Sequence, residues 1–144
     1  QKPIVQRFPS PSYALARVAG NGISLLIEPL NRFDAPGYFL QTADQAAEII
    51  AEINDPNLKL MFDCYHLQIM QGDISRLLQS MLPIIGHIQI AAVPSRAEPD
   101  EGELDYSHIL KHIQNIGYKG FIGAEYHPRG STEAGLGWRR GLGG

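Results

Sequence analysis

The stretch "LKLMFD", residues 58–63, decides the fold, because it is an apolar run of strand length that ends on an acid. Three further runs share this pattern: "ISLLIE" at residues 23–28, "HIQIAA" at residues 87–92 and "FIGAEY" at residues 121–126. Short apolar runs of this kind are typical of buried strands. We therefore expect four strands.

Segments with helical spacing separate the four runs. Thr42 begins one of them with Gln45 three residues later, a capping-box pattern, and Asp73 and Asp105 precede two others as N-caps. A shorter helix is expected from Tyr13, before the first strand. Strands separated by single helices run parallel, because each crossover returns the chain to the same end of the sheet. The order α-β-α-β-α-β-α-β predicts an α/β protein.

Each expected strand carries a polar residue at or near its carboxyl end: Glu28, Asp63, Gln89 and Glu125. A (β/α)₈ barrel devotes about 31 residues to each unit, so these side chains recur about once per unit and are expected to converge. Three carboxylates and an amide held close together repel one another or bind protons unless a cation balances them. All-oxygen ligation suits Mg²⁺ or Mn²⁺. Taken singly, each acid is more often a helix cap or a solvated loop residue.

The composition excludes several classes of protein. The 144 residues are 44% hydrophobic and 19% charged, as expected for a single globular domain. The net charge is −3 and the twelve Lys and Arg are scattered, which argues against nucleic acid and membrane surfaces as partners and favours a small substrate. No apolar stretch approaches the roughly 20 residues that span a bilayer, so we expect a cytoplasmic protein.

The ends of the chain differ in character from its middle. Residues 1–12 hold three prolines and are expected to be irregular, residues 13–138 to form the α/β domain, and residues 139–144 to form a flexible tail. The chain begins with Gln1 rather than Met, so a piece of a longer protein is one alternative.

Four ordered motifs carry a resemblance to a known family. They are "SLLIEPLNRFDAPGYFL", "LMFDCYHLQIMQGD", "HIQIAAVPSRAEPDEGELDY" and "GFIGAEYHPRGSTEAGLGW". Together they resemble the hydroxypyruvate isomerase family, within the xylose-isomerase-like TIM barrels. The resemblance implies a (β/α)₈ barrel of which this chain supplies about the last four β/α units. It also implies a metal site at Glu28, Asp63, Gln89 and Glu125, although related sugar epimerases usually have histidine at the position of Gln89.

The resemblance and the chemistry of isomerisation together suggest roles for individual residues. Moving a proton between adjacent carbons through an enediolate requires an acid/base pair, for which we favour Glu28 and Glu125. His66 matches a family residue that contacts a substrate oxygen, and Arg96 could bind a substrate carboxylate in a bidentate manner. The expected reaction interconverts hydroxypyruvate and 2-hydroxy-3-oxopropanoate (tartronate semialdehyde), with a small hydroxy-oxo acid as substrate.

Several alternatives stay open at this point. The chain could be a related 2-oxo-tetronate isomerase or a ketose 3-epimerase, and the divalent metal need not be obligatory. It could also be a truncated, non-catalytic fragment that associates with itself or with a partner. Because a half-barrel exposes strand edges that invite self-association, a homo-oligomer is one further alternative.

Overall fold

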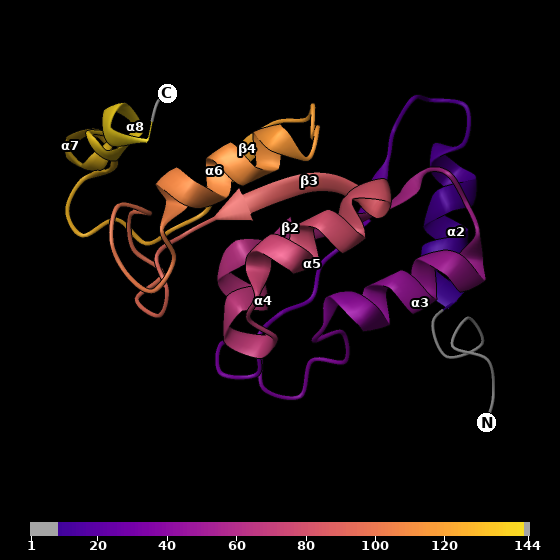
Figure 1. The fold of residues 1–144 in the computed structure, drawn as a ribbon. Helices are drawn as coiled ribbons and strands as arrows, with labels where there is room; N and C mark the ends of the chain where they lie inside the picture. Colours follow the sequence, from indigo (N-terminus) through magenta and orange to yellow (C-terminus); the bar gives the residue numbers. More distant parts are fainter. Residues whose placement is uncertain (1–8, 143–144) are drawn as a thin grey trace.

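The structure, a computed structural model, describes residues 9–142. Four parallel strands form one sheet in the order β1-β2-β3-β4 (Figure 1): β1 Leu25–Ile27, β2 Leu58–Asp63, β3 Ile85–Ile90 and β4 Ile122–Ala124. In chain order, the helices are α2 (Pro9–Val18), α3 (Ala43–Ile53), α4 (Cys64–Met70), α5 (Ile74–Met81), the 3₁₀ turn η1 (Leu82–Ile84), α6 (Tyr106–Asn115), α7 (Thr132–Gly135) and α8 (Trp138–Gly141). The predicted parallel α/β class is confirmed.

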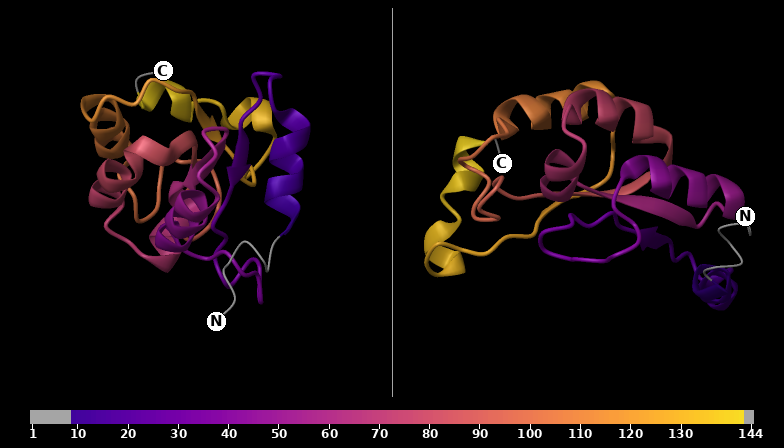
Figure 2. Two further views of the ribbon diagram at one scale, coloured as in Figure 1. Left: turned by 90° about the vertical axis from the view of Figure 1, so that its right-hand side faces the viewer. Right: turned by 90° about the horizontal axis from the view of Figure 1, so that it is seen from below.

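The helices α3 to α6 lie on one side of the sheet (Figures 1 and 2). Their apolar faces pack on β2 and β3, where side chains such as Leu60, Phe62 and Ile88 are completely buried. The opposite face of the sheet is left open among the described residues (Figure 2). None of the helices within residues 9–142 has the length and apolar character needed to cross a bilayer.

Two of the three expected N-caps make their capping hydrogen bond. Thr42 Oγ1 accepts a hydrogen bond from the Gln45 N–H at 3.2 Å and the Gln45 side chain accepts one from the Thr42 N–H, so the predicted capping box of α3 is confirmed. Asp105 caps α6 as predicted. Asp73 occupies the N-cap position of α5, but its carboxylate binds Arg76 at 2.8 Å instead of capping the helix.

The observed strand bounds differ in part from the apolar runs that predicted the strands. β2 has the predicted bounds, whereas β1 and β4 are shorter than the expected runs because each pairs on one side only. β3 lies two residues earlier than expected, since the backbone of Ala92 bonds Arg96 and Ala97 in the following loop rather than a neighbouring strand. The helix α4 was not expected; it follows β2 without a loop, because Asp63 both ends the strand and caps the helix.

The chain ends differ in part from expectation. α2 begins at Pro9, four residues before the expected start at Tyr13, and α8 extends over Trp138–Gly141, where a tail was expected from residue 139. The rest of the expected irregular segment, residues 1–8, and the last two residues of the expected tail lie outside the described residues.

Candidate active site

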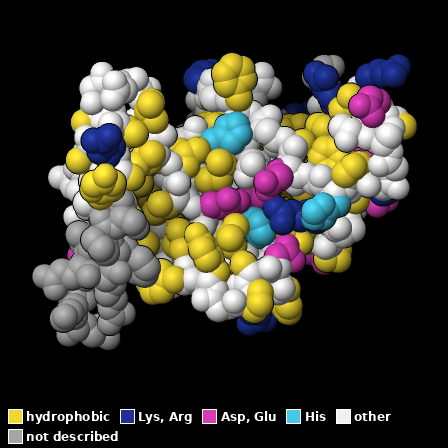
Figure 3. Space-filling model, turned by 180° about the vertical axis from the view of Figure 1, so that it is seen from behind, with side chains coloured by type: hydrophobic (Ala, Val, Ile, Leu, Met, Phe, Trp, Pro, Cys, Tyr) yellow, Lys and Arg dark blue, Asp and Glu magenta, His cyan; other side chains and the backbone are white. Residues whose placement is uncertain are grey.

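Successive side chains of the central strands point to opposite faces of the sheet, so only every second side chain reaches the open face. Met61 and Asp63 on β2 lie opposite His87 and Gln89 on β3, and residues between them such as Phe62 point into the helical core. Figure 3 shows the open face, where acidic, histidine and basic side chains gather near the middle with hydrophobic side chains beside them. The carboxyl ends of parallel strands are where ligands bind in such folds.

Three of the predicted residues form a tight cluster. Potential ligand atoms of Glu28, Asp63 and His66 all lie within 4.8 Å of one another. His66 Nε2 is 4.0 Å from Glu28 Oε1 and 3.8 Å from Asp63 Oδ2. These three atoms and Gln89 Oε1 are buried and have no hydrogen-bond partner among the described residues. Buried polar atoms are almost always paired, so four unpaired ones on adjoining strand ends indicate a site for a ligand.

A buried network fixes the tautomer of His66. Asn31 Oδ1 accepts from the N–H groups of Phe33 and Asp34, both at 3.0 Å, so the Asn31 amide nitrogen must face the histidine. His66 Nδ1 then accepts from the Asn31 backbone N–H at 3.2 Å and from the Asn31 side-chain amide at 2.8 Å. The proton of the neutral imidazole therefore sits on Nε2, which acts as a donor toward the cluster. This favours contact with a substrate oxygen over metal ligation for His66.

Burial sets the protonation of the cluster. It raises the pKa of Glu28 to about 7, helped by Asp63 and Glu125 and opposed by Arg96. Burial likewise raises the pKa of Asp63 to about 6 and lowers the pKa of His66 to about 4, so His66 is neutral near pH 7 and makes no ion pair. Without a cation, the cluster reduces its repulsion by holding protons.

Arg96 and Glu125 lie together at the edge of this cluster. Arg96 Nη2 donates to Glu125 Oε2 at 2.6 Å, and Arg96 Nη1 is 3.6 Å from Asp34 Oδ2. The guanidinium also lies 5.1 Å from the centre of the Tyr65 ring, a cation–π contact. Arg96 has a positive φ of 55° and its carbonyl accepts from the His127 N–H at 2.7 Å. The guanidinium is thus held over the strand ends by three side chains.

A second group of ion pairs, centred on Arg129, joins the loop that carries Arg96 to the loop that carries Glu125. Arg129 Nε donates to Glu98 Oε2 at 2.9 Å, and the Arg129 backbone N–H lies 3.2 Å from both Glu98 oxygens. The other Arg129 nitrogens bind Asp100 at 2.6 Å and Glu101 at 3.0 Å. Burial acts to raise the pKa of the 1% exposed Glu98, but backbone N–H groups and the Arg129 charge hold it below its ordinary value. The loops after β3 and β4 are therefore fastened together.

The structure brings the predicted residues into two adjoining groups. Glu28, Asp63 and His66 cluster, with Gln89 beside Asp63 in the sheet register, whereas the Glu125 carboxylate pairs with Arg96. His66, expected in a loop, lies in the first turn of α4.

Sequence reasoning missed three residues that shape the site. Asn31 is fully buried against His66, and Asp34 accepts from the Tyr65 hydroxyl at 2.9 Å and from the Asn31 side chain at 3.0 Å. The available signal was the run of polar residues just after Glu28, in "EPLNRFD", because such residues follow a strand end.

The residues present fit a hard divalent cation. Unpaired oxygens of Glu28, Asp63 and Gln89 lie at neighbouring strand ends, and carboxylate and amide oxygens are the ligands such ions prefer. Burial raises the pKa of both acids, because the charged carboxylates are poorly solvated there. A cation would replace the protons that the acids otherwise hold.

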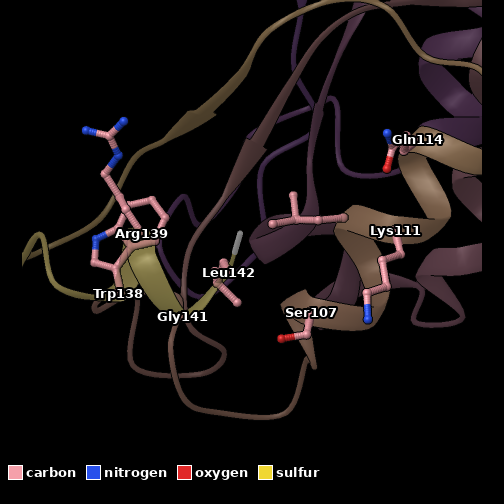
Figure 4. A pocket seen from close by; sticks show the side chains of 8 residues that line it. Ser107, Lys111, Gln114, Trp138, Arg139, Gly141 and Leu142 are labelled. Carbon is pink, nitrogen blue, oxygen red and sulfur yellow. The ribbon is translucent and has the colours of Figure 1, made fainter. Parts of the chain in front are cut away.

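A separate groove does not contribute to this site. It has a volume of about 590 Å³ and lies between α6 and α8, lined by residues that include Lys111, Trp138 and Arg139 (Figure 4). None of the candidate residues lines it, so the strand ends remain the candidate active site.

Comparison with known proteins gives the family. The xylose isomerase-like TIM barrel family model matches residues 11–142. The 2-oxo-tetronate isomerase of Cupriavidus necator is 49% identical over 127 residues, 88% of this chain and 49% of the relative. The hydroxypyruvate isomerase of Escherichia coli is 43% identical over 126 residues, again 88% of this chain and 49% of the relative.

The solved structures agree with this assignment. A crystal structure named AP endonuclease, family 2, from Brucella melitensis superposes with a TM-score of 0.86 at 45% identity, covering 90% of this chain and 50% of that chain. The chain thus spans about half the length of the relatives it matches. It belongs to the xylose isomerase-like TIM barrel family.

Proposed function

We propose that the chain carries the proton-transfer site of an isomerase that interconverts hydroxypyruvate and 2-hydroxy-3-oxopropanoate. Residues 13–138 would supply the last four β/α units of the barrel. The observation that carries the proposal is the set of buried, unpaired polar atoms of Glu28, Asp63, His66 and Gln89 at adjoining strand ends. The names of the two relatives, both isomerases of small oxo acids, support the same reaction class.

The acid/base pair is Glu28 and Glu125. One carboxylate removes a proton from C3 of hydroxypyruvate, which leaves an enediolate. The other carboxyl group gives a proton to C2, and the C3 hydroxyl proton passes to the C2 oxygen, so C3 becomes the aldehyde and C2 carries the hydroxyl group. In the metal-free chain burial raises the pKa of Glu28 to about 7, which suits a group that must take up and release a proton near neutral pH. Glu28 follows β1 and Glu125 follows β4, so the two can approach a substrate from opposite sides.

Neighbouring residues bind and orient the substrate. His66 donates from Nε2 to the substrate oxygen where negative charge develops, since Asn31 keeps the Nδ1 atom as an acceptor. Arg96 binds the substrate carboxylate with its guanidinium, which Asp34 and Tyr65 hold in place. Glu28, Asp63, Gln89 and Glu125 would hold Mg²⁺ or Mn²⁺, which when bound polarises the carbonyl as a Lewis acid.

Solvent-deuterium exchange into hydroxypyruvate tests the proposal. The chain is incubated with substrate and Mg²⁺ or Mn²⁺ in D₂O, and deuterium at C3 of hydroxypyruvate and at C2 of the product 2-hydroxy-3-oxopropanoate is followed by NMR. Glu28→Gln and Glu125→Gln should each slow exchange by about 10² to 10⁴. Glu48→Gln, at an exposed position of α3, is the matched control and should exchange at the wild-type rate. Equal rates in all four proteins would contradict the mechanism.

A four-carbon oxo acid is the second candidate substrate. The 49% identity to a 2-oxo-tetronate isomerase favours it, and it presents the same carboxylate and hydroxy-carbonyl groups to Arg96 and the acid/base pair. The ratio of kcat/KM for the two acids decides between them. A neutral ketose as the better substrate would instead favour the epimerase alternative.

A further inference from the structure

The guanidinium of Arg96 faces two carboxylates of its own chain. Nη2 donates to Glu125 Oε2 at 2.6 Å, and Nη1 is 3.6 Å from Asp34 Oδ2. Arg96 Cζ lies over the Tyr65 ring, 5.1 Å from its centre. A guanidinium binds a carboxylate most specifically through two parallel N–H groups. The end of Arg96, where the two terminal nitrogens lie side by side, therefore becomes open to a substrate carboxylate when one of the two acids moves away.

Asp34 is held in place by its other contacts. Its carboxylate accepts hydrogen bonds from the Tyr65 hydroxyl at 2.9 Å and from the Asn31 side-chain amide at 3.0 Å. Both donors belong to buried residues, and Asn31 is fully buried against His66. Moving Asp34 would break both of these bonds and leave buried donors unpaired, which is costly. Asp34 therefore stays beside Arg96 when a substrate binds.

Glu125 is the acid that can move. Within residues 9–142 its carboxylate is hydrogen-bonded to Arg96 alone. The backbone on both sides of the pair is fixed: the Arg96 carbonyl accepts from the His127 N–H at 2.7 Å. The Glu125 N–H donates to the Ile90 carbonyl at 3.2 Å. A rotation of the Glu125 side chain is therefore enough to separate the two charged groups.

The two residues have separate tasks in the proposed reaction. Glu125 must reach the carbon atoms that exchange a proton, while Arg96 must receive the substrate carboxylate. In the structure they bind each other instead. Because the two carboxylates compete for the same donors, binding of one excludes the other, and each can shift the population of the other.

We propose that the substrate carboxylate displaces Glu125 from Arg96 and so releases the acid/base group that acts on the substrate. This inference rests on the proposed function and adds a source of selectivity to it. Arg96 favours a substrate that carries a carboxylate twice, first by binding it and then by giving up Glu125. A neutral ketose has no group that competes for the guanidinium, so it leaves Glu125 paired. The site therefore discriminates against neutral sugars that have the same hydroxy-carbonyl pattern.

Binding of glycolate to the metal-free chain tests this exchange. Glycolate has a carboxylate and a hydroxyl group but no carbonyl group to enolise, so NMR titration of the ¹⁵N-labelled chain measures affinity without reaction. Glu125→Gln and Glu125→Asp should each bind glycolate about tenfold more tightly than the wild-type chain. Glutamine removes the charge of the contact with Arg96, and aspartate is too short to make the contact. Because aspartate keeps the negative charge, it separates loss of the contact from loss of the charge.

Control variants show where glycolate binds. Arg96→Ala should lose the binding, and Glu48→Gln, at an exposed position of α3, should keep the wild-type affinity. Unchanged or weaker affinity in both Glu125 variants, a gain confined to Glu125→Gln, or full binding by Arg96→Ala would overturn the exchange. The deuterium-exchange experiment is independent of this one. A chain that shows the expected glycolate affinities but transfers no deuterium would contradict the proposed function alone.

Discussion

Glu28→Gln should stabilise the metal-free chain at pH 8 although it removes a residue of the active site. Glu28 Oε1 is buried and has no hydrogen-bond partner within residues 9–142. Burial, followed by the charges of Asp63 and Glu125, raises the pKa of this carboxyl group to about 7. Ionised Glu28 therefore destabilises the folded state. Glutamine keeps the shape and removes the charge.

The magnitude follows from the pKa shift. A rise from 4.5 to about 7 corresponds to about 3 kcal/mol at pH 8, where the group is ionised in both states. The Glu28 side chain is only 28% exposed, so solvent screens little of this effect. Because the folded state binds the proton more tightly, stability is retained below pH 4.5 and lost as the pH rises through 7.

Neighbouring titratable groups change how the stability of the wild-type chain depends on pH. They do not change the difference in stability between the wild-type chain and Glu28→Gln. Asp63, with its pKa raised to about 6, acts in the same direction as Glu28. His66 acts in the opposite direction, because its pKa is lowered to about 4 and the unfolded state binds the proton first as the pH falls below 6.5. Both remain in the Glu28→Gln variant, so the difference between the two proteins isolates Glu28.

Urea unfolding with a chelator at pH 5 and pH 8 measures the effect. The variant should gain about 3 kcal/mol at pH 8 and less than about 1 kcal/mol at pH 5, and Glu48→Gln should gain nothing at either pH. Saturating Mn²⁺ should stabilise the wild-type chain and Glu48→Gln, but not Glu28→Gln. No gain at pH 8, or an equal gain at both pH values, would refute the reasoning, since neither result is a property of buried charge.

Three further predictions concern the residues around the acids. Asn31→Ala removes the side-chain amide donor to His66 Nδ1 and leaves only the backbone N–H of residue 31, so ¹⁵N NMR of the ring should change from the single Nε2–H tautomer toward a mixture, and kcat/KM should fall about tenfold. Arg96→Ala should raise KM for hydroxypyruvate by about tenfold to a hundredfold and affect a neutral ketose less; an equal effect on both would argue against carboxylate binding. Arg129→Ala removes the guanidinium that pairs with the buried Glu98 carboxylate and leaves it only the backbone N–H of residue 129, so the melting temperature should fall and kcat should decrease about tenfold, with Arg129→Lys in between.

The parts of the fold that depend on local sequence could be predicted. Both bounds of β2 and the capping box at Thr42 follow from neighbouring residues. The strand-end positions of Glu28 and Asp63 follow from the period of parallel β/α units, so their convergence could be expected as well.

The remaining features depend on contacts between distant segments. The helix α4 could not be predicted because Asp63 is both the last residue of β2 and the N-cap of α4. No loop residues between the two elements mark the start of the helix. The contact of Asn31 with His66 joins residues 35 positions apart, and the pairing of Arg96 with Glu125 joins residues 29 apart. Such contacts are set by how loops fold over the sheet.

Calorimetric titration with Mn²⁺ tests most directly the central claim that the strand ends form a cation site. At pH 7 we expect saturable binding of one ion that releases roughly half a proton, because Glu28 with a pKa of about 7 is half protonated there. Asp63→Asn should abolish this binding, whereas Asp55→Asn, in the turn before β2, should preserve it. An absence of saturable binding, or equal affinity in Asp63→Asn, would contradict the account.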